Sequence, residues 1–482
     1  MDPLSQLRSA LARADYSVEA IAQRLDLDIT LNIRRDDVPV HLRRLRHGDG
    51  LDALIRFFLL QSDLTVDDAQ AVLEPARLDD LEEIGLLRRD GSAVHPLLRL
   101  APHAGLVIAH DPHLPGDLRR DSVLGLTSSA RTLASMTVRD PVDRALDLGT
   151  GCGVQALLAA GHAKEVVAVD LNARALWLTA LNCRLNGIGN VDCRKGDLFE
   201  PVEGEKFDLV VTNPPFVISP SSDYLFRDSG FEEDGLARAV VTGAAGVLAE
   251  GGFAHVMCNW VARKDEPWSA AVQSWIADLG CDALILHYDT LDPLPYAAAW
   301  NDGVAAGLDH LSATLDSWLD YYRERGIEAI GMGAVILRRR TGTRNWVKAA
   351  TLARGPSGAA GIQVRRLFAA QDALAATTDA AGLLDWSFAA VDGHRLQQTL
   401  TFKGGAYTTE DAVILLDDGL GLGNGVPAQA LHVLLRLDGS STLRDIVAET
   451  AEETGLDVEG LSKSAADCVG ELFGLGLLDG RP

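Results

Sequence analysis

The segment whose residue types best suit chemistry is Asn213-Pro214-Pro215-Phe216. It follows the apolar run 207–212, which predicts a buried strand that ends where the segment begins. Two consecutive prolines restrict the backbone and donate no hydrogen bond, so the segment presents oxygen acceptors at a fixed position. The Asn213 side chain and a nearby carbonyl can therefore accept both hydrogens of a planar NH2 group, with Phe216 as a stacking face. Alone, such a tetrapeptide is as often a rigid turn.

A glycine-rich loop lies upstream and has the sequence Gly149-Thr150-Gly151-Cys152-Gly153. An apolar strand that contains Asp147 precedes the loop, and an Ala- and Leu-rich helix follows it. Glycines permit tight turns and close approach of a ligand, and the helix N-terminus offers free N–H groups. The next predicted strand ends in Asp170, where an acidic side chain can accept from two ribose hydroxyls. By itself the loop fits NAD or FAD almost as well.

The order of the parts distinguishes between these cofactors. Asp197 and Leu198 follow a third predicted strand, and Asn213 follows a fourth. A glycine loop, two acidic residues and Asn-Pro-Pro-Phe at successive strand ends resemble a class I S-adenosylmethionine (SAM) methyltransferase. More narrowly, the chain resembles the amino-methylating branch that includes the HemK/PrmC glutamine methyltransferases, the RsmC-like ribosomal RNA guanine methyltransferases and the N6-adenine methyltransferases. The resemblance covers roughly residues 120–345.

The resemblance implies the fold, the cofactor and the roles of individual residues. It implies an α/β fold with a Rossmann-like, seven-stranded class I methyltransferase core, and SAM as the cofactor. Asp147 would order the loop and reach the SAM amino group, Asp170 would bind the ribose, and Asp197 would bind the adenine amino group. The implied cofactor-binding residues are Asp147, Gly149, Thr150, Gly151, Gly153, Asp170, Leu171, Asn172, Asp197, Leu198 and Asn213. The target nitrogen would lie at Asn213, Pro214, Pro215 and Phe216.

The chemistry expected at this site needs little acid–base machinery. The sulfonium methyl group is already activated, so rate comes mostly from aligning nitrogen, methyl and sulfur. An amide or aromatic amino nitrogen is a poor nucleophile because its lone pair is delocalised. Acceptors from Asn213 and the Pro214 carbonyl would bind the N–H hydrogens and draw the nitrogen towards a tetrahedral shape, which favours the transition state. We therefore assign Asn213 an orienting and polarising role, and no role as a strong base.

Composition predicts an intracellular enzyme. The chain has 482 residues and six cysteines without a CxxC pair, so neither a disulfide framework nor a zinc site is indicated, and no metal is expected. No secretory pattern is present, and no apolar run approaches the roughly 18 residues needed to span a bilayer. We expect a cytoplasmic protein without a membrane partner. The sequence leaves the oligomeric state open and slightly favours a monomer.

Charge bears on the substrate. The formal net charge is −24, from 44 Lys and Arg against 68 Asp and Glu. A protein that grips DNA or RNA usually carries a basic face, which such an acidic chain does not suggest. The basic clusters are Arg34-Arg35, residues 43–47 and residues 338–340, and we interpret each as a solvated edge or a set of ion pairs.

Three domains are predicted. Residues 1–115 form an N-terminal helical, winged-helix-like domain, with helices capped by Ser17 and Thr65. Residues 116–345 form the methyltransferase domain, with a helical insertion over about 290–325 that is either a substrate lid or a plain cover on the sheet. Residues 346–482 form a mainly helical, α-rich C-terminal domain, which resembles the PqqD kind of peptide-chaperone domain or a second winged helix.

Three functions remain open. The first is methylation of a planar amide or amino nitrogen on a protein, a peptide or a small molecule, which the acidity of the chain favours. The alternative is methylation of adenine or guanine amino groups in RNA or DNA, with Phe216 stacked on the base. The third is a SAM-binding regulator built on a winged helix, which the intact Asn213 to Phe216 segment disfavours.

Overall fold

The computed structural model describes residues 2–28, 31, 33, 37–45, 47–112, 118–228, 230–301, 308–342, 344–377 and 380–482. The described chain forms two compact units. The first contains residues 1–131, 141–285 and 290–347, so it includes both the N-terminal region and the predicted catalytic core. The second contains residues 132–140, 286–289 and 348–482. Arg34, Arg35, Arg46 and the predicted boundary at residues 115 and 116 lie outside the described residues.

A central eight-stranded sheet forms the frame of the first unit, with β13 (Val347–Thr351) at one edge and the strand order β13-β11-β12-β10-β9-β6-β7-β8. The other strands are β6 (Val142–Leu148), β7 (Ala163–Asp170), β8 (Val191–Lys195), β9 (Phe207–Thr212), β10 (Leu248–Ala262), β11 (Cys281–Leu291) and β12 (Ala329–Arg339). Neighbours from β8 to β10 are parallel, whereas β12 runs antiparallel to β10. The predicted α/β, Rossmann-like core is therefore confirmed, with one strand more than the seven predicted.

Burial explains the composition of these strands. Residues 166–169 of β7 are all at most 1% exposed, as expected for a parallel strand that is covered on both faces. The flanking helices are α7 (Ser128–Met136), α8 (Val154–Ala159), α9 (Ala173–Asn186), α10 (Gly235–Val247) and α11 (Ala270–Ile276). One apolar core joins α10 and α11 to the sheet. A second core joins α8 and α9 to the N-terminal region.

The N-terminal region is helical with short strands. Its helices are α1 (Pro3–Arg13), α2 (Val18–Leu25), α3 (Val38–Arg44), α4 (Gly50–Leu54), a π-helical turn (Ile55–Leu59), α5 (Val66–Leu73) and α6 (Leu78–Glu83). Its strands are β1 (Leu64–Thr65), β2 (Leu87–Asp90), β3 (Ala93–Pro96), β4 (Arg99–His103) and β5 (Leu106–His110). Ser17 and Thr65 cap α2 and α5 as predicted. The three strands pair in the order β1-β3-β2, and β2 and β3 follow α5 and α6. That this region is winged-helix-like stays a prediction.

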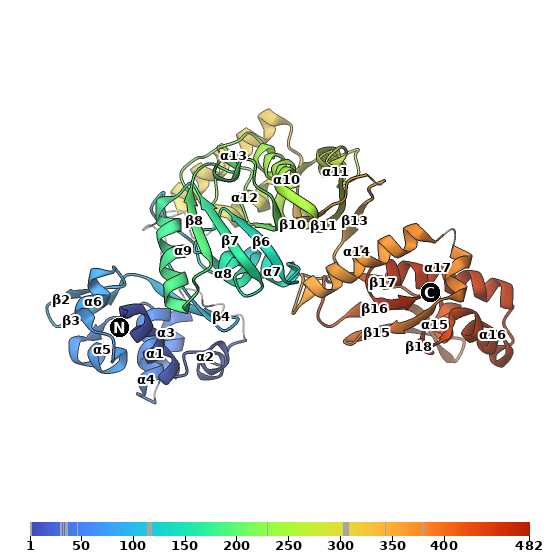
Figure 1. The fold of residues 1–482 in the computed structure, drawn as a ribbon, viewed down its shortest axis with the longest axis horizontal. Coiled ribbons are helices and arrows are strands. Elements are labelled where there is room, and N and C mark those ends of the chain that lie inside the picture. The colour runs from blue at the N-terminus through green and yellow to red at the C-terminus, as the bar shows by residue number, and fades with distance from the viewer. Residues whose placement is uncertain are drawn as a thin grey trace. The chain divides into compact units, whose positions relative to one another are not determined.

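Helix α9 attaches this region to the core (Figure 1). The Asn182 side chain accepts from the Ala109 N–H at 2.7 Å and donates to the Ala109 carbonyl at 2.9 Å. Asn186 makes the same pair of bonds with Val107. Two asparagines one turn apart therefore act as an additional strand edge for β5, which fixes the hairpin beside the predicted cofactor loop.

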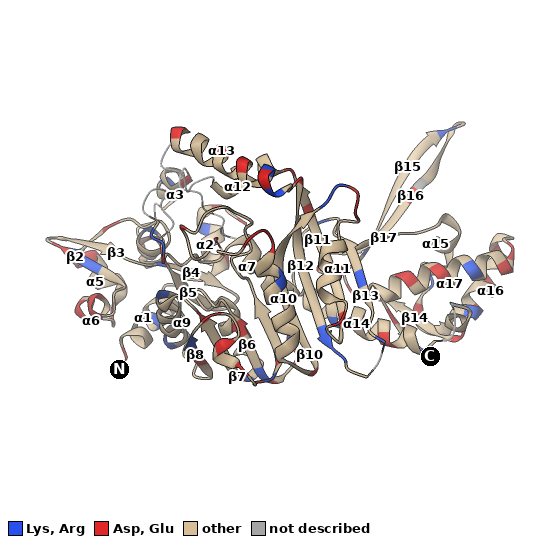
Figure 2. Ribbon diagram, turned by 90° about the horizontal axis from the view of Figure 1, so that it is seen from above, with Lys and Arg blue, Asp and Glu red and all other residues tan. Residues whose placement is uncertain are grey.

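The second unit contains more strand than predicted. Its helices are α14 (Ala360–Ala376), a 3-10 turn (Ala380–Asp385), α15 (Ala428–Leu434), α16 (Leu443–Thr454) and α17 (Val458–Gly474). Its strands are β13 (Val347–Thr351), β14 (Ser387–Ala390), β15 (His394–Lys403), β16 (Ala406–Leu416), β17 (Gly423–Gly425), β18 (Asp438–Thr442) and β19 (Leu478–Arg481). Figure 2 shows the β15–β16 hairpin extending beyond α15 to α17. Strand β15 escaped prediction because its polar, Thr- and Gln-rich residues are exposed or half-buried and lack an apolar alternation. Strand β16 differs, because Ala412, Ile414 and Leu416 in its second half are buried in the core of this unit.

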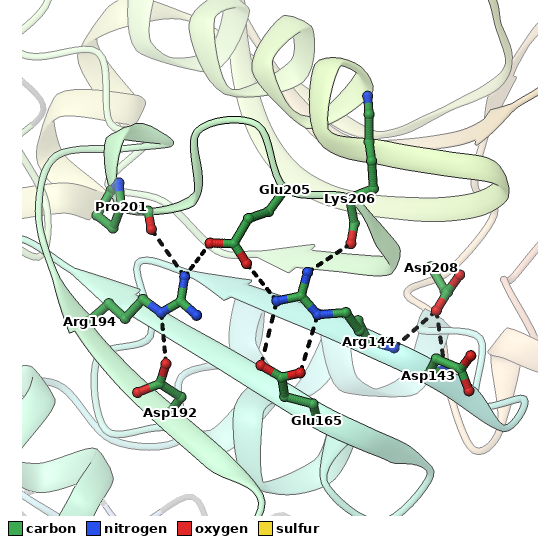
Figure 3. A network of polar contacts seen from close by, with 9 residues as sticks. All are labelled: Asp143, Arg144, Glu165, Asp192, Arg194, Pro201, Glu205, Lys206 and Asp208. Atoms are coloured by element: carbon green, nitrogen blue, oxygen red, sulfur yellow. Dashed lines mark hydrogen bonds and ion pairs between the residues drawn. The ribbon is translucent and has the colours of Figure 1, made fainter.

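An ion-pair network ties β6, β7 and β8 to the loop before β9 (Figure 3). The Glu205 carboxylate accepts from Arg144 at 2.5 Å and also from Arg194. Arg144 further contacts Glu165 at 3.3 Å, and Arg194 contacts Asp192 at 2.7 Å. The Arg144 hydrogen bond holds the pKa of Glu205 below its ordinary value, even though burial alone would raise it. Each carboxylate is matched by an arginine, so this network stabilises the sheet.

The basic cluster at residues 338–340 forms ion pairs. Arg338 and Arg340 both pair with the buried Asp282, at 2.6 and 3.6 Å, as the ion-pair interpretation of that basic cluster predicts.

Among the described residues, no helix combines the length and the apolar character that a membrane crossing requires.

Candidate active site

The predicted site residues lie at one edge of the sheet. Strands β9, β6, β7 and β8 are parallel neighbours, and their carboxyl ends are level: Leu148 pairs with both Thr212 and Val169, and Asp170 pairs with Lys195. The loops that follow these four ends carry the predicted cofactor and acceptor residues. The carboxyl edge of parallel strands is the usual place for a ligand in such folds.

The glycine loop has the backbone that the sequence predicts. Gly149, Gly151 and Gly153 have backbone φ values of +68°, +57° and +82°, which residues other than glycine rarely adopt. A Cβ at Gly149 would meet nothing within 4 Å, so the loop faces open space there. A Cβ at Gly153 would lie 2.8 Å from Thr179, so this glycine is also required for packing of the loop against α9.

The Asp147 side chain is hydrogen-bonded to the glycine loop and to the helix that follows it. Its carboxylate accepts from the Thr150 hydroxyl at 2.7 Å and from the Ala156 N–H, in the first turn of α8, at 2.9 Å. The side chain is only 2% exposed, and this burial raises the pKa of Asp147 to about 7. Neighbouring Cys152 is also buried, which raises the pKa of its thiol to about 12, so the thiol stays protonated and serves packing.

Asp170 connects the loop to the next strand end. One carboxylate oxygen accepts from the Gly151 N–H at 2.9 Å, and the other accepts from the Asn172 N–H at 2.8 Å. Burial raises the pKa of Asp170, although these backbone hydrogen bonds oppose the shift. Asn172 then caps α9 by accepting from Arg174, and its amide donates to the Asp121 carbonyl at 2.9 Å. Leu171 is 55% exposed and leaves an apolar side chain beside the acid.

Asp197 lies at the third strand end. The preceding Gly196 N–H donates to the Asp170 carbonyl at 3.2 Å, which joins the two acidic segments. Asp197 is exposed, and within the described chain its carboxylate has no hydrogen-bond partner. Leu198 has φ +46°, an uncommon conformation for a branched residue that often marks a functional loop.

Asn213 is held by its amide nitrogen. This nitrogen donates to the Ser129 hydroxyl, in the first turn of α7, at 3.3 Å. The Asn213 Oδ1 atom is buried and has no hydrogen-bond partner in the described structure. A buried acceptor without a partner costs free energy, so the site is built to receive an N–H donor here. The Pro214 carbonyl already accepts from the Phe216 N–H at 2.7 Å, so only its second lone pair is free for a substrate.

The helical insertion is hydrogen-bonded to the backbone of the segment that follows Phe216. Its described parts are α12 (Pro293–Asn301) and α13 (Leu308–Arg325). The Tyr322 hydroxyl donates to the Ile218 carbonyl at 2.7 Å, and the Tyr296 hydroxyl accepts from the Ile218 N–H at 3.1 Å. Both backbone groups of Ile218, two residues after Phe216, are thus fixed by buried tyrosines. Trp300 meets Phe216 edge to face, with ring centroids 5.9 Å apart. These contacts favour a fixed cover over a mobile lid.

A buried ion pair stabilises the loop that follows Phe216. Arg227 and Asp228 are 3% and 6% exposed and pair at 2.8 Å. Arg227 also donates to the Ser221 hydroxyl and to the Asn301 side chain of the insertion, at 3.0 and 3.1 Å. Burial alone would raise the pKa of Asp228, but the Arg227 hydrogen bonds hold it below its ordinary value. The pair therefore joins the acceptor loop to the insertion.

We predict that Arg227→Ala lowers the free energy of unfolding by about 3–5 kcal/mol, because it leaves the Asp228 charge buried without its positively charged partner. The matched control is Arg323→Ala, which removes an exposed pair with Asp320 and should cost under about 1 kcal/mol. Urea unfolding followed by tryptophan fluorescence measures both, since Trp318 lies against Arg227. Equal losses in the two variants would contradict the role of the buried pair.

Several contacts at the candidate site could not be predicted from the sequence. Ser129, Tyr296 and Tyr322 are brought to the acceptor segment by tertiary packing alone. On the cofactor side, the Thr179 hydroxyl donates to the Gly151 carbonyl at 3.1 Å, and Asn182 donates to the Cys152 carbonyl at 2.8 Å. These last two residues lie on one face of α9, a spacing that is too common in helices to be informative.

Comparison with known proteins gives matches in two regions. Residues 125–266 match the family described as Methyltransferase small domain, and residues 13–97 match a Domain of unknown function (DUF7059). The chain is 36% identical over 129 residues to "Release factor glutamine methyltransferase" of Xylella fastidiosa (strain 9a5c), covering 24% of this chain and 47% of that protein. It is 41% identical over 96 residues to "Ribosomal protein uL3 glutamine methyltransferase" of Xanthomonas campestris pv. campestris, covering 19% of this chain and 31% of that protein. The chain thus spans half or less of the length of these relatives.

Proposed function

Because residues 125–266 are a class I methyltransferase domain of the HemK/PrmC-like kind, we propose that the chain transfers a methyl group from SAM to a planar amide or amino nitrogen. The observation that carries the proposal is the Asn213 Oδ1 atom, which is buried at the strand end beside the glycine loop and has no hydrogen-bond partner in the part of the chain that the structure describes. A neutral amide oxygen there suits an N–H donor and would not abstract a proton as a strong base does.

The residues around the glycine loop fit SAM. The three left-handed glycines leave the backbone open to a ligand, and Gly149 faces empty space. Asp170 uses both oxygens on backbone N–H groups, and a carboxylate retains further lone pairs for the two ribose hydroxyls. Leu171 offers an apolar side chain for the adenine, and the free Asp197 carboxylate can accept from its amino group. SAM supplies an activated methyl group.

In the proposed reaction the protein aligns the target nitrogen with the methyl group and polarises the N–H bonds of that nitrogen. Asn213 Oδ1 accepts one hydrogen of the target nitrogen, and the remaining lone pair of the Pro214 carbonyl accepts the other. Ser129 fixes the Asn213 amide so that its oxygen faces the substrate. Phe216, held edge to face by Trp300, packs against the planar group. SAM bound at the glycine loop would supply the methyl group to the nitrogen with its sulfur as the leaving group, and the surplus proton would leave to water.

We propose a protein or peptide as the acceptor. The relatives whose names state a substrate act on a release factor and on a ribosomal protein. The net charge of −24 and the pairing of Arg338 and Arg340 with Asp282 also weigh against a nucleic acid. The test is transfer of radiolabelled methyl from SAM into an extract of the source cell, followed by digestion. Label lost with protease supports the proposal, whereas label lost only with nuclease would replace the acceptor with RNA or DNA.

We predict that SAM binds more tightly as the pH rises through 7. Asp147 has a pKa of about 7 without ligand, and a carboxylate that faces the SAM ammonium group must be ionised. Below pH 7, binding must therefore release a proton, which weakens it. The affinity should be about tenfold lower at pH 6 than at pH 8.

Calorimetric titration in buffers of different ionisation enthalpy measures both the affinity and the released proton. Asp147→Asn is the matched variant, because it keeps an oxygen acceptor for Thr150 and Ala156 but does not titrate. Any pH dependence of SAM affinity that this variant retains reports the ionisation of Asp170, because burial also raises the pKa of Asp170. A wild-type affinity that is flat with pH, or that falls as the pH rises, would contradict the assignment of Asp147.

A further inference from the structure

Trp300 is the residue of the helical insertion whose ring meets the Asn213–Phe216 segment. It lies near the end of α12, and its ring centroid is 5.9 Å from that of Phe216, with an angle of 76° between the two ring planes. Phe216 is the residue on which the planar target group is proposed to stack, three positions after the buried Asn213 oxygen. Trp300 therefore lies next to the place where the methyl acceptor would bind.

The backbone at Trp300 is held by the buried ion pair. The Arg227 guanidinium group donates to the Trp300 carbonyl at 3.3 Å and to the Asn301 side chain at 3.1 Å. Arg227 is itself 3% exposed and paired with Asp228. The end of α12 is thus anchored to the loop that follows Phe216.

The Trp300 ring is held by a second aromatic contact. It packs against Tyr296, one turn earlier in α12, with ring centroids 6.2 Å apart. The Tyr296 hydroxyl accepts from the Ile218 N–H at 3.1 Å and from the Asn259 side chain at 2.8 Å. Because Tyr296 is fully buried and bonded on both sides, the Trp300 ring rests on a fixed support.

Trp300 nevertheless keeps part of its ring exposed. Three aromatic residues of the insertion are at most 1% exposed, namely Tyr296, Trp318 and Tyr322. Tyr321 is half-buried, but its hydroxyl accepts from the Glu233 N–H at 2.9 Å and the Arg325 guanidinium group covers its ring. Trp300 is also half-buried, as is Phe216. A large aromatic ring that is fixed in place and partly open to solvent is typical of residues that bind a partner.

We propose that Trp300 contacts the methyl acceptor and forms the second wall of its binding site. This inference rests on the proposed function. Because the planes of Phe216 and Trp300 meet at 76°, the two rings form a corner. A planar group that stacks on one ring leaves the chain that carries it against the other. The insertion is then a fixed part of the acceptor site.

The test is a titration of the methyl acceptor at saturating SAM with the full chain. The probe is the fraction of a source-cell extract that takes up radiolabelled methyl, expected to be protein, offered at increasing concentrations. Trp300→Leu should raise the half-saturating concentration about tenfold, because the aromatic contact surface is lost. The plateau rate should stay within about threefold of the wild type, and SAM affinity should be unchanged in calorimetric titration, because Asn213 and the glycine loop are intact.

Two further variants separate contact with the acceptor from general packing. Trp300→Phe keeps a smaller aromatic ring and should raise the half-saturating concentration only about threefold. Trp386→Leu is the matched control, because Trp386 is a half-buried tryptophan of the second unit that packs against two rings, Phe388 and Phe473. It should leave the half-saturating concentration unchanged. The Tm of each variant reports whether it is folded.

Each result decides the inference. A half-saturating concentration that is the same in Trp300→Leu and the wild type overturns it. A loss of plateau rate or of SAM affinity, with the half-saturating concentration unchanged, would make Trp300 a structural support of Phe216 and also overturns it. If Trp300→Leu does not fold, Trp300→Phe decides alone: a rise of about threefold supports the inference, and no rise overturns it.

Failure of this inference differs from failure of the proposed function. Wild-type protein that labels no fraction of the extract would contradict the proposed function and this inference with it. Wild-type protein that labels a fraction, with the same titration curve for Trp300→Leu, would contradict the role of Trp300 alone.

Discussion

Asn213→Ala should abolish methyl transfer while leaving SAM affinity within a few-fold of the wild type. The side chain supplies a buried oxygen with no hydrogen-bond partner among the described residues, so its removal would take an acceptor from the proposed target N–H while the glycine loop stays intact. Loss of one preorganised polar group at a reacting centre typically lowers kcat by about 10²–10³-fold. Single-turnover transfer and equilibrium SAM binding, measured on the same preparation, separate the two effects.

The control for this prediction is Asn424→Ala, which removes an asparagine that donates to Glu471 in the second unit. It should leave both quantities unchanged. Ser129→Ala provides a graded variant, because it frees the Asn213 amide to rotate without removing it. Its loss in kcat should be smaller than that of Asn213→Ala. Turnover retained by Asn213→Ala would contradict the amino-group mechanism.

Asp170→Ala should weaken SAM binding about 100-fold. Two charge-assisted hydrogen bonds to ribose hydroxyls would be lost, each worth about 1.5–3 kcal/mol, partly offset by water. The same change also removes the acceptor for the Gly151 and Asn172 N–H groups, so the glycine loop loses its anchor to β7. Calorimetric titration with SAM measures the loss.

Asp192→Ala is the matched control for this second prediction. It removes an exposed carboxylate from β8, where its partner is Arg194, and should bind SAM as the wild type does. Methyl transfer by Asp170→Ala should recover at saturating SAM, because the acceptor segment is intact. A defect in kcat that persists at saturation, with unchanged SAM affinity, would show that Asp170 has a different role.

The cofactor half of the site could be predicted from the sequence because local signals encode it. Left-handed glycines, an acidic residue at a strand end and the strand–loop–helix order all lie within one βαβ unit. The level ends of β6 and β9 then bring Asn213 next to this unit through register alone. The Rossmann-like class of the core followed from the resemblance.

The remaining features depend on contacts between distant segments. The tyrosines that hold Ile218 lie 78 and 104 residues away from it, and no periodicity in the insertion marks them. Strand β15 lacks the apolar alternation that identifies a strand. Such features arise from tertiary packing, which overrides local propensity.

The most direct test of the central claim is acid hydrolysis of the radiolabelled product formed with wild-type protein. An amide that carries the methyl group on nitrogen releases volatile labelled methylamine when the amide bond is cleaved, and an amino-methylated side chain or base retains the label on nitrogen. We predict labelled methylamine. Label released as methanol from an ester, or label found on carbon, would contradict transfer to a planar nitrogen at Asn213.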